Sequence, residues 1–153
     1  MNDIVTRPYA SGDFNACMAI FDSNVPTFFA MEERAEFSEF LRVTNTTENP
    51  YLVFTLKGSV IACGGLTIQI ERRQASLSWG MVERAFHRKG LGTRLTQDRL
   101  TLARRFPSVD TVALSTTQYS SGFYSQLGFI VAKVTPDGFG AGLDRLDMSL
   151  RIA

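Results

Sequence analysis

The spacing of apolar residues changes along this 153-residue chain, and each change predicts a new element. Apolar residues recur at helical spacing from about Ser11 to Asn24 and again from Met31 to Val43, so both segments are expected to be helices. Further helices are expected at 93–106 and 120–126. Short apolar or alternating runs bounded by turn residues predict strands. These strands are residues 4–7, 51–56, 60–70, 75–82, 111–116, 129–134 and 143–152.

Turn residues between these elements predict how the strands connect. Lys57-Gly58-Ser59 predicts a hairpin, and Gly64-Gly65 predicts a bulge or bend in the strand that follows. The strands on either side of the helix at 93–106 are expected to run parallel, because a helical crossover joins them. Segment 136–142, rich in Gly, Pro and Asp, is expected to be a flexible connection within a final strand pair. The chain is therefore predicted to be one α/β domain over residues 1–153.

The helix predicted at 93–106 carries apolar and basic positions together. Leu91, Leu95, Leu102 and Phe106 are expected to form its apolar face, with Arg99 nearby and Leu100 on the opposite side. Basic residues concentrate around the same segment, and they are Arg84, Arg88, Lys89, Arg94, Arg99, Arg104 and Arg105. The formal net charge of the whole chain is only +1, which argues against a nucleic-acid-binding domain. A local basic field of this kind is suited to one small polyanion.

Cysteine, histidine and hydropathy narrow the functional classes further. Cys17 and Cys63 both lie in apolar contexts and are expected to be buried free thiols. His87 is the single histidine and no ligand spacing typical of a metal site occurs, so no metal is expected. The N-terminal residues lack the pattern of a signal peptide, and the longest apolar run is far shorter than a membrane span. A cytoplasmic protein without membrane contact is the expectation.

The segment His87-Arg88-Lys89-Gly90-Leu91-Gly92-Thr93 lies between a predicted strand and a predicted helix. Glycine lets the backbone approach a ligand closely, and the free N–H groups of a helix start favour an anion such as pyrophosphate. A nucleotide-triphosphate loop is excluded, because the string Gly-x-x-x-x-Gly-Lys-Ser/Thr does not occur. A dinucleotide loop fits poorly, since Leu95 stands where its third glycine belongs and Asp110 opens a strand rather than closing one. Coenzyme A, which carries a pyrophosphate and a 3′-phosphate, is the third candidate, and the alternative is a strand-to-helix turn that needs glycine and binds no ligand.

Two segments of the chain resemble the GNAT acyltransferase superfamily. Residues 87–92 are similar to that family's Gln/Arg-x-x-Gly-x-Gly/Ala loop, with His87 where the family usually has Gln or Arg. Residues 123–129, Phe-Tyr-Ser-Gln-Leu-Gly-Phe, resemble its Leu/Phe-Tyr-x-x-Leu-Gly-Phe segment, and Thr117 and Ser120 stand in looser upstream positions. The resemblance covers essentially the whole chain. It implies a GNAT fold, with a mixed, mostly antiparallel sheet of six to seven strands flanked by about four helices.

The resemblance also implies an activity. A GNAT N-acetyltransferase transfers an acetyl or other acyl group from acetyl-CoA to a primary amine by direct attack in a ternary complex, without a metal. Tyr124 would donate a proton to the departing thiolate, while the main chain of Met81 and Val82 would bind the pantetheine arm and the oxyanion. The residues expected at the cofactor are Met81, Val82, His87, Arg88, Lys89, Gly90, Leu91, Gly92, Thr93, Thr117, Ser120, Phe123 and Tyr124.

The sequence defines the acceptor side of the site less closely. Phe28 and Phe29 are the aromatic residues expected to face the amine of a small molecule or peptide. Glu83 is the first choice for the base that deprotonates this amine, ahead of Glu71 and Asp144. A GNAT-fold module that binds acyl-CoA without turnover is the alternative function, and a nucleic-acid binder is a third. A homodimer stays open, because many members of the family pair.

Overall fold

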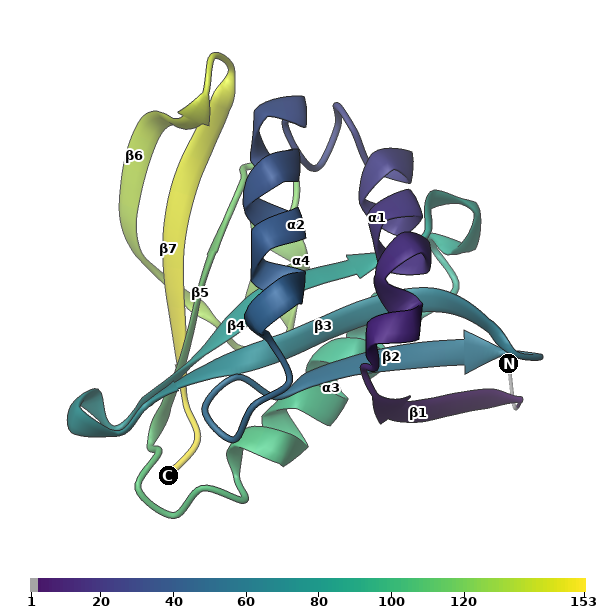
Figure 1. The fold of residues 1–153 in the computed structure, drawn as a ribbon. Helices are drawn as coiled ribbons and strands as arrows, with labels where there is room; N and C mark the ends of the chain where they lie inside the picture. Colours follow the sequence, from purple (N-terminus) through teal and green to yellow (C-terminus); the bar gives the residue numbers. More distant parts are fainter. Residues whose placement is uncertain (1–2) are drawn as a thin grey trace.

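The computed structural model describes residues 3–153, and its strands form one seven-stranded sheet (Figure 1). The strands are β1 (Ile4–Pro8), β2 (Tyr51–Leu56), β3 (Ser59–Gln69), β4 (Gln74–Val82), β5 (Thr111–Thr116), β6 (Ile130–Gly140) and β7 (Leu143–Arg151). Their order across the sheet is β1-β2-β3-β4-β5-β7-β6, and each neighbouring pair is antiparallel except β4 with β5. The predicted mixed, mostly antiparallel sheet and its one parallel crossover are confirmed.

Helices cover both faces of this sheet. α1 (Phe14–Ser23) and α2 (Arg34–Val43) lie on one face, in front of the sheet in Figure 1, whereas α3 (Leu91–Ala103) and α4 (Ser121–Gln126) lie behind it. The sheet also divides the hydrophobic core, with one cluster of buried residues beneath α1 and α2 and another beneath α3. Beneath α1 and α2, the side chains with no exposed surface are Cys17, Phe21, Phe37, Tyr51, Val53 and Cys63. Both cysteines are therefore buried free thiols, as their apolar contexts predicted.

β4 and β5 pair for only a short distance before they separate. Residues 74–76 are paired with residues 111–113, and no further pairing follows, although β4 continues to Val82 and β5 to Thr116. One edge of β4 therefore has no neighbouring strand beyond Ser76, so its backbone groups on that edge are open to a ligand. This separation at the centre of the sheet positions the site.

A β-bulge bends β4 where it leaves β5. Two residues of β4, Trp79 and Gly80, stand opposite the single residue Gly64 of β3. Trp79 has a left-handed backbone, with φ of 42°, which is uncommon for a bulky side chain and indicates a local constraint. The bulge predicted from Gly64-Gly65 is confirmed, and its extra residue belongs to the partner strand.

The predicted flexible connection at 136–142 is wrong. β6 runs to Gly140, which pairs with Leu143 of β7, so only a tight turn separates the two strands. The pairing is irregular between Thr135 and Gly140, and this irregularity accommodates the Gly, Pro and Asp residues that suggested a loop. Long strand pairing has outweighed local turn propensity here.

The predicted face of α3 is also wrong in part. Leu100, expected opposite the core, is buried, whereas Leu102 is only partly buried. The helix begins at Leu91 rather than near residue 93, because Gly90 adopts the N-cap position. Arg99, expected near the apolar face, lies on the buried side of the helix.

Asp13 and Arg7 form a partly buried ion pair that fixes β1 to the start of α1. The Arg7 guanidinium donates to both Asp13 oxygens, at 2.7 and 2.9 Å, and the Ala10 N–H donates to the same carboxylate at 2.9 Å. The hydrogen bonds from Arg7 lower the pKa of Asp13. Two charge-assisted hydrogen bonds of this kind contribute more to the free energy of unfolding than an exposed ion pair does.

We expect Asp13→Asn to lower the free energy of unfolding by about 1–3 kcal/mol at pH 7, because it removes the charge from these bonds. Since the folded pKa of Asp13 is lowered, its contribution is complete above the unfolded pKa of about 3.9 and is lost as the pH falls through the folded value. Urea unfolding at pH 7 and at pH 3 should therefore give a smaller difference between variant and wild type at the lower pH. Asp22→Asn, which breaks the exposed pair with Arg34, is the control and should change little.

Candidate active site

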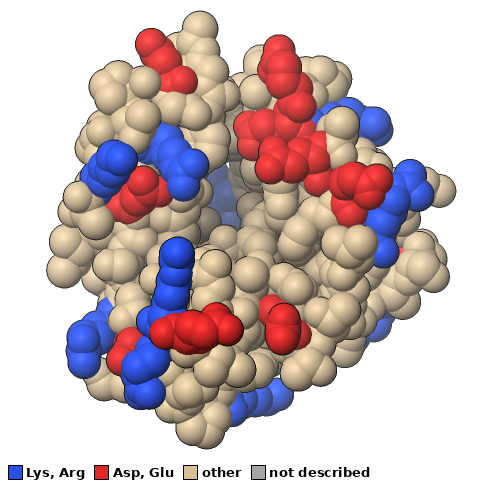
Figure 2. Space-filling model, turned by 60° about the vertical axis from the view of Figure 1, so that its left-hand side comes forward, with Lys and Arg blue, Asp and Glu red and all other residues tan. Residues whose placement is uncertain are grey.

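A cleft of about 1320 Å³ opens where β4 and β5 separate. Its walls come from both strands, from β7, from the connection between α1 and α2, from the start of α3 and from α4. Figure 2 shows a hollow between two lobes of the molecule, with acidic side chains gathered on one rim. The cleft therefore brings together segments far apart in the sequence, including the glycine loop and the segment at 123–129.

Three side-chain hydrogen bonds to the main chain fix the open end of β4. The Tyr51 hydroxyl donates to the Trp79 carbonyl at 2.7 Å, and burial raises the pKa of this hydroxyl, which keeps it protonated as a donor. At Val82, the carbonyl oxygen accepts the Asn24 amide at 2.9 Å and lies 2.8 Å from Nε2 of His87. These bonds hold the bulged strand although it lacks a partner strand on one side.

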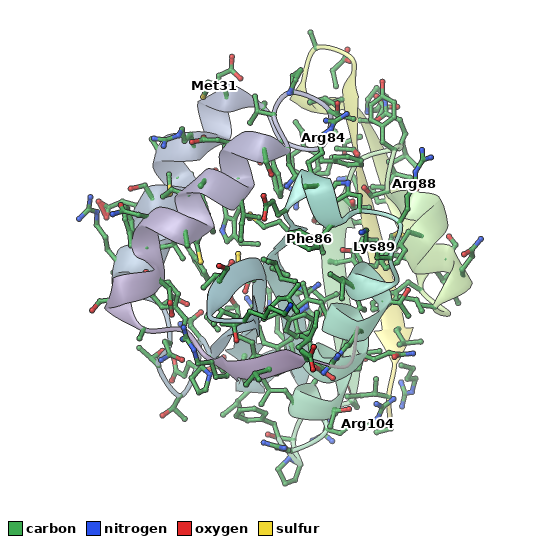
Figure 3. All side chains as sticks on the ribbon, turned by 90° about the vertical axis from the view of Figure 1, so that its right-hand side faces the viewer. Met31, Arg84, Phe86, Arg88, Lys89 and Arg104 are labelled. Carbon is green, nitrogen blue, oxygen red and sulfur yellow. The ribbon has the colours of Figure 1, made fainter. Side chains whose placement is uncertain are left out.

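The glycine loop has the geometry of an open anion cradle. Arg88 and Gly90 both have left-handed backbones, with φ of 63° and 79°, and Gly90 is the N-cap of α3. No side chain caps this helix, and its first main-chain bond runs from the Arg94 N–H to the Gly90 oxygen at 3.1 Å. The preceding N–H groups are thus available to a ligand. Figure 3 shows Arg84, Arg88 and Lys89 near the start of α3, away from Arg104 at its other end.

α4 presents Tyr124 to the cleft. The Tyr124 ring makes edge contacts with Phe123 and Phe129, at centroid distances of 5.0 and 5.8 Å, and it is half-buried. Phe123 in turn packs over the start of α3, so that a Cβ placed on Gly92 would lie 3.4 Å from its ring. This contact holds α4 against the glycine loop. Tyr124, the next residue of α4, also lines the cleft.

Aromatic side chains wall the cleft on the side of α1 and α2. Phe29 is stacked with Phe21 and with Trp79, at centroid distances of 5.0 and 6.0 Å. Phe28 makes an edge contact with His87 at 5.3 Å. Because Phe28, Phe29 and Trp79 all line the cleft, this wall is apolar and rigid.

Two carboxylates line the same cleft, and their surroundings differ. Burial raises the pKa of Glu33, whose oxygen accepts the Ala30 N–H at 3.1 Å. Asp147 accepts the Ser115 hydroxyl at 2.6 Å and the Arg145 guanidinium at 3.1 Å, and these bonds lower its pKa. Glu33 is consequently the better proton acceptor of the two.

A family model for the acetyltransferase (GNAT) domain matches residues 19–152 of this chain. The chain belongs to the GNAT family. It is accordingly an acyltransferase, as the two sequence segments implied. Among curated protein sequences there is no significant match to this GNAT chain.

Solved structures share the fold at low sequence identity. The ribosomal-protein-S18-alanine N-acetyltransferase from Escherichia coli has a TM-score of 0.81 and 17% identity, covering 98% of this chain and 94% of that one. A GCN5-related N-acetyltransferase from Kribbella flavida has a TM-score of 0.81 and 17% identity, covering 99% of each chain. An aminoglycoside 6′-N-acetyltransferase complexed with coenzyme A has a TM-score of 0.78 and 14% identity, covering 97% of each.

Most of the site residues predicted from the sequence line the cleft of this GNAT chain. Those that do are Phe28, Phe29, Met81, Val82, His87, Arg88, Gly92, Thr117, Ser120, Phe123 and Tyr124. Lys89, Gly90, Leu91 and Thr93 lie beside it in the loop and first turn of α3, where Leu91 is buried in the core and only its main chain is available. The His87 ring faces the Val82 carbonyl and Phe28 rather than the loop.

Glu83 lies apart from the other predicted residues. It lines a separate hollow with α1 residues and the turn between β2 and β3, while Tyr124 lines the main cleft. Of the weaker choices for the base, Glu71 lies in the exposed turn before β4. Asp144 accepts the Asp137 N–H at 3.0 Å in the β6–β7 hairpin.

Three residues of the cleft were not found from the sequence. Trp79 and Glu33 were missed because their positions depend on the bulge and on the short helix before α2, neither of which periodicity locates to a single residue. Arg99 was expected in a basic field and near the apolar face of its helix, but not as a residue of the site. A charged residue among apolar helix positions was the available signal.

No helix within residues 3–153 is long and apolar enough to cross a membrane. In the same range, no group of three or more His, Cys, Asp and Glu side chains is arranged to hold a metal ion.

Proposed function

We propose that this GNAT chain is an N-acetyltransferase that transfers an acetyl group from acetyl-CoA to the primary amine of a small molecule or peptide. The observation that carries the proposal is the continuous cleft that joins the start of α3 to Tyr124 between the separated strands β4 and β5. The open N–H groups of 88–93 and nearby basic side chains suit a pyrophosphate. The unpaired edge of β4 at Met81 and Val82 suits the amide-containing pantetheine arm, bound like an added strand.

The chemistry assigned to the chain is two proton transfers around one acyl transfer. The amine nitrogen attacks the thioester carbonyl carbon, a C–N bond forms and the C–S bond breaks. Tyr124 gives its phenolic proton to the departing sulfur, and a main-chain N–H group on the open edge of β4, at Met81 or Val82, stabilises the oxyanion. Glu33 takes the proton that the amine loses, directly or through water, and replaces Glu83 as our choice of base because it lines the same cleft as Tyr124.

The aromatic wall is assigned to the acceptor. Phe28, Phe29 and Trp79 offer apolar surface beside Glu33, so an amine attached to an apolar or aromatic group fits this side best. The acidic rim would attract the protonated amine before it is deprotonated (Figure 2).

Binding and turnover must be measured separately to test this function. Acetyl-CoA should raise the melting temperature, and a double-reciprocal plot with a turned-over amine should give intersecting lines, as direct attack in a ternary complex requires. Intact-protein mass after incubation with acetyl-CoA alone should be unchanged. A covalent acetyl adduct with parallel lines would contradict direct attack, and thermal stabilisation without turnover of any amine would favour the non-catalytic module.

We expect Glu33→Gln to lower kcat/KM about 10²-fold at neutral pH, because glutamine keeps the acceptor for the Ala30 N–H but cannot accept a proton. In the wild type kcat/KM should rise with pH as Glu33 ionises. Because the pKa of Glu33 is raised, this rise should occur at a higher pH than for an ordinary glutamate. Glu33→Gln should show no such rise. Glu32→Gln, at an exposed neighbouring position, should keep it, and an unchanged profile in Glu33→Gln would remove Glu33 as the base.

A further inference from the structure

Arg99 is the most unusual side chain in the cleft. It comes from the middle of α3 and is only 1% exposed, which makes it the largest of the fully buried side chains among the described residues. Arginine is almost never fully buried unless it is paired. The other buried charged residue of residues 3–153, Asp13, obeys this rule through its bonds with Arg7.

Within residues 3–153, the Nε of Arg99 is buried without a hydrogen-bond partner, and Arg99 takes part in none of the ion pairs. The guanidinium keeps its charge in proteins, so it carries a desolvation cost that the free protein does not offset. A group that is retained under such a cost is a candidate for binding a ligand.

Two glycines leave the space that the guanidinium fills. A Cβ on Gly80 would lie 2.5 Å from one terminal nitrogen of Arg99, and a Cβ on Gly64 would lie 3.3 Å from Cζ. These are the glycines of the β-bulge, so the head group lies against the bulge where β4 leaves β5. Arg99 and Gly80 both line the cleft.

The position of Arg99 separates it from the phosphate-binding part of the site. At 1.5 Å per residue, it lies about 13 Å further along α3 than Gly90. The basic residues at the start of α3 are Arg84, Arg88 and Lys89 (Figure 3), so the phosphates do not need Arg99. The strand bulge beside Arg99 is instead the region where, on the proposed function, the reacting groups meet.

We propose that Arg99 receives a carboxylate of the substrate, so that this chain acts on a donor or an acceptor that carries one. The planar guanidinium matches a carboxylate in a two-bond geometry and becomes paired only when that substrate is bound. The source is either the free acid of a dicarboxylic acyl chain on coenzyme A or the carboxylate of an amino-acid-like acceptor. The inference rests on the proposed function and adds a substrate class to it.

Matched substrates that differ in one carboxylate distinguish the two sources. Succinyl-CoA and butyryl-CoA form the donor pair, and phenylalanine and phenylalanine amide form the acceptor pair. In the pair that contains the carboxylate bound by Arg99, we expect kcat/KM to be at least tenfold higher for the member with the carboxylate than for the member without it. Arg99→Met should abolish this preference, because kcat/KM falls at least tenfold more for the carboxylate-bearing member than for the neutral one, whereas Arg99→Lys should retain part of the preference. Arg104→Met, an exposed change beyond the end of the same helix, is the control.

A second measurement separates this role from a structural one. Because the Nε of Arg99 has no partner and its head group forms no ion pair within residues 3–153, Arg99→Met should fold and raise the melting temperature without ligand. A structural role predicts the reverse. If the variant is too unstable, Arg99→Gln in the same assays replaces it.

Two outcomes would overturn the inference: equal rates within both pairs in the wild type, or a carboxylate preference that survives in Arg99→Met. Failure of the proposed function has a different signature, which is no thiol release from any donor with any amine. In that case the melting-temperature shifts with succinyl-CoA, butyryl-CoA and the two acceptors still test Arg99. Stabilisation by a carboxylate ligand that disappears in Arg99→Met would support it, and equal shifts would overturn it.

Discussion

Replacing Tyr124 by phenylalanine is expected to lower kcat by about 10²-fold or more while leaving the affinity for CoA almost unchanged. The edge contacts of the ring with Phe123 and Phe129 involve its carbon framework, so phenylalanine preserves them and α4 stays in place against Gly92. Only the hydroxyl is lost. If this hydroxyl protonates the departing sulfur, its removal acts on the transition state and not on binding of the free cofactor.

Initial rates and CoA binding by calorimetry check this expectation together. Tyr119→Phe removes an exposed hydroxyl from the same cleft and should change neither quantity appreciably. Equal losses of kcat and CoA affinity in Tyr124→Phe would mean that the hydroxyl holds the cofactor rather than donating a proton. Loss of rate in Tyr119→Phe alone would move the acid to the other tyrosine.

Gly90→Val is expected to weaken CoA binding by about tenfold or more. Gly90 has φ of 79°, and a β-branched side chain in this region costs about 1–3 kcal/mol, which converts to roughly a tenfold change in affinity for each 1.4 kcal/mol. The space around Gly90 is open, so the effect comes from the backbone and not from a clash. The strained residue would move out of the left-handed region and turn the first N–H groups of α3 away from a pyrophosphate.

Gly92→Ala is the matched control two residues along the same loop. Its Cβ would meet the Phe123 ring at 3.4 Å, an ordinary contact, and its φ is not positive. Calorimetric titration with CoA should therefore give a dissociation constant near that of the wild type for Gly92→Ala and a much higher one for Gly90→Val. Equal affinities in the two variants would show that the conformation of Gly90 does not organise the cofactor site.

Local patterns in the sequence predicted the elements whose cause is local. The helix at Phe14–Ser23 follows from its apolar spacing, and the hairpin at Lys57-Gly58-Ser59 follows from its turn residues. The glycine loop could be located because a left-handed N-cap favours glycine, and Gly90 has that conformation. Tyr124 was selected because residues 123–129 resemble a segment of the GNAT family, and its catalytic role stays a prediction.

Features that depend on contacts between distant segments could not be predicted in the same way. β6 extends to Gly140 because its pairing with β7 resumes there, opposite Leu143, after an irregular stretch that begins at Thr135, and no property of these residues alone indicates this. Glu33 and Glu83 look alike in sequence, and only the packing of the connection between α1 and α2 places Glu33 in the cleft with Tyr124. The burial of Arg99 likewise depends on Gly64 and Gly80, which come from two other elements.

The most direct test of the account is thiol release from acetyl-CoA measured with a panel of amines that includes amino acids, polyamines, aminoglycosides and peptide N-termini. The products should be followed by mass at the same time. If the chain is an N-acetyltransferase, at least one amine is turned over, with one N-acetylated product formed for each thiol released and no turnover in the absence of amine. Binding of acetyl-CoA together with no thiol release above hydrolysis for every amine would contradict it.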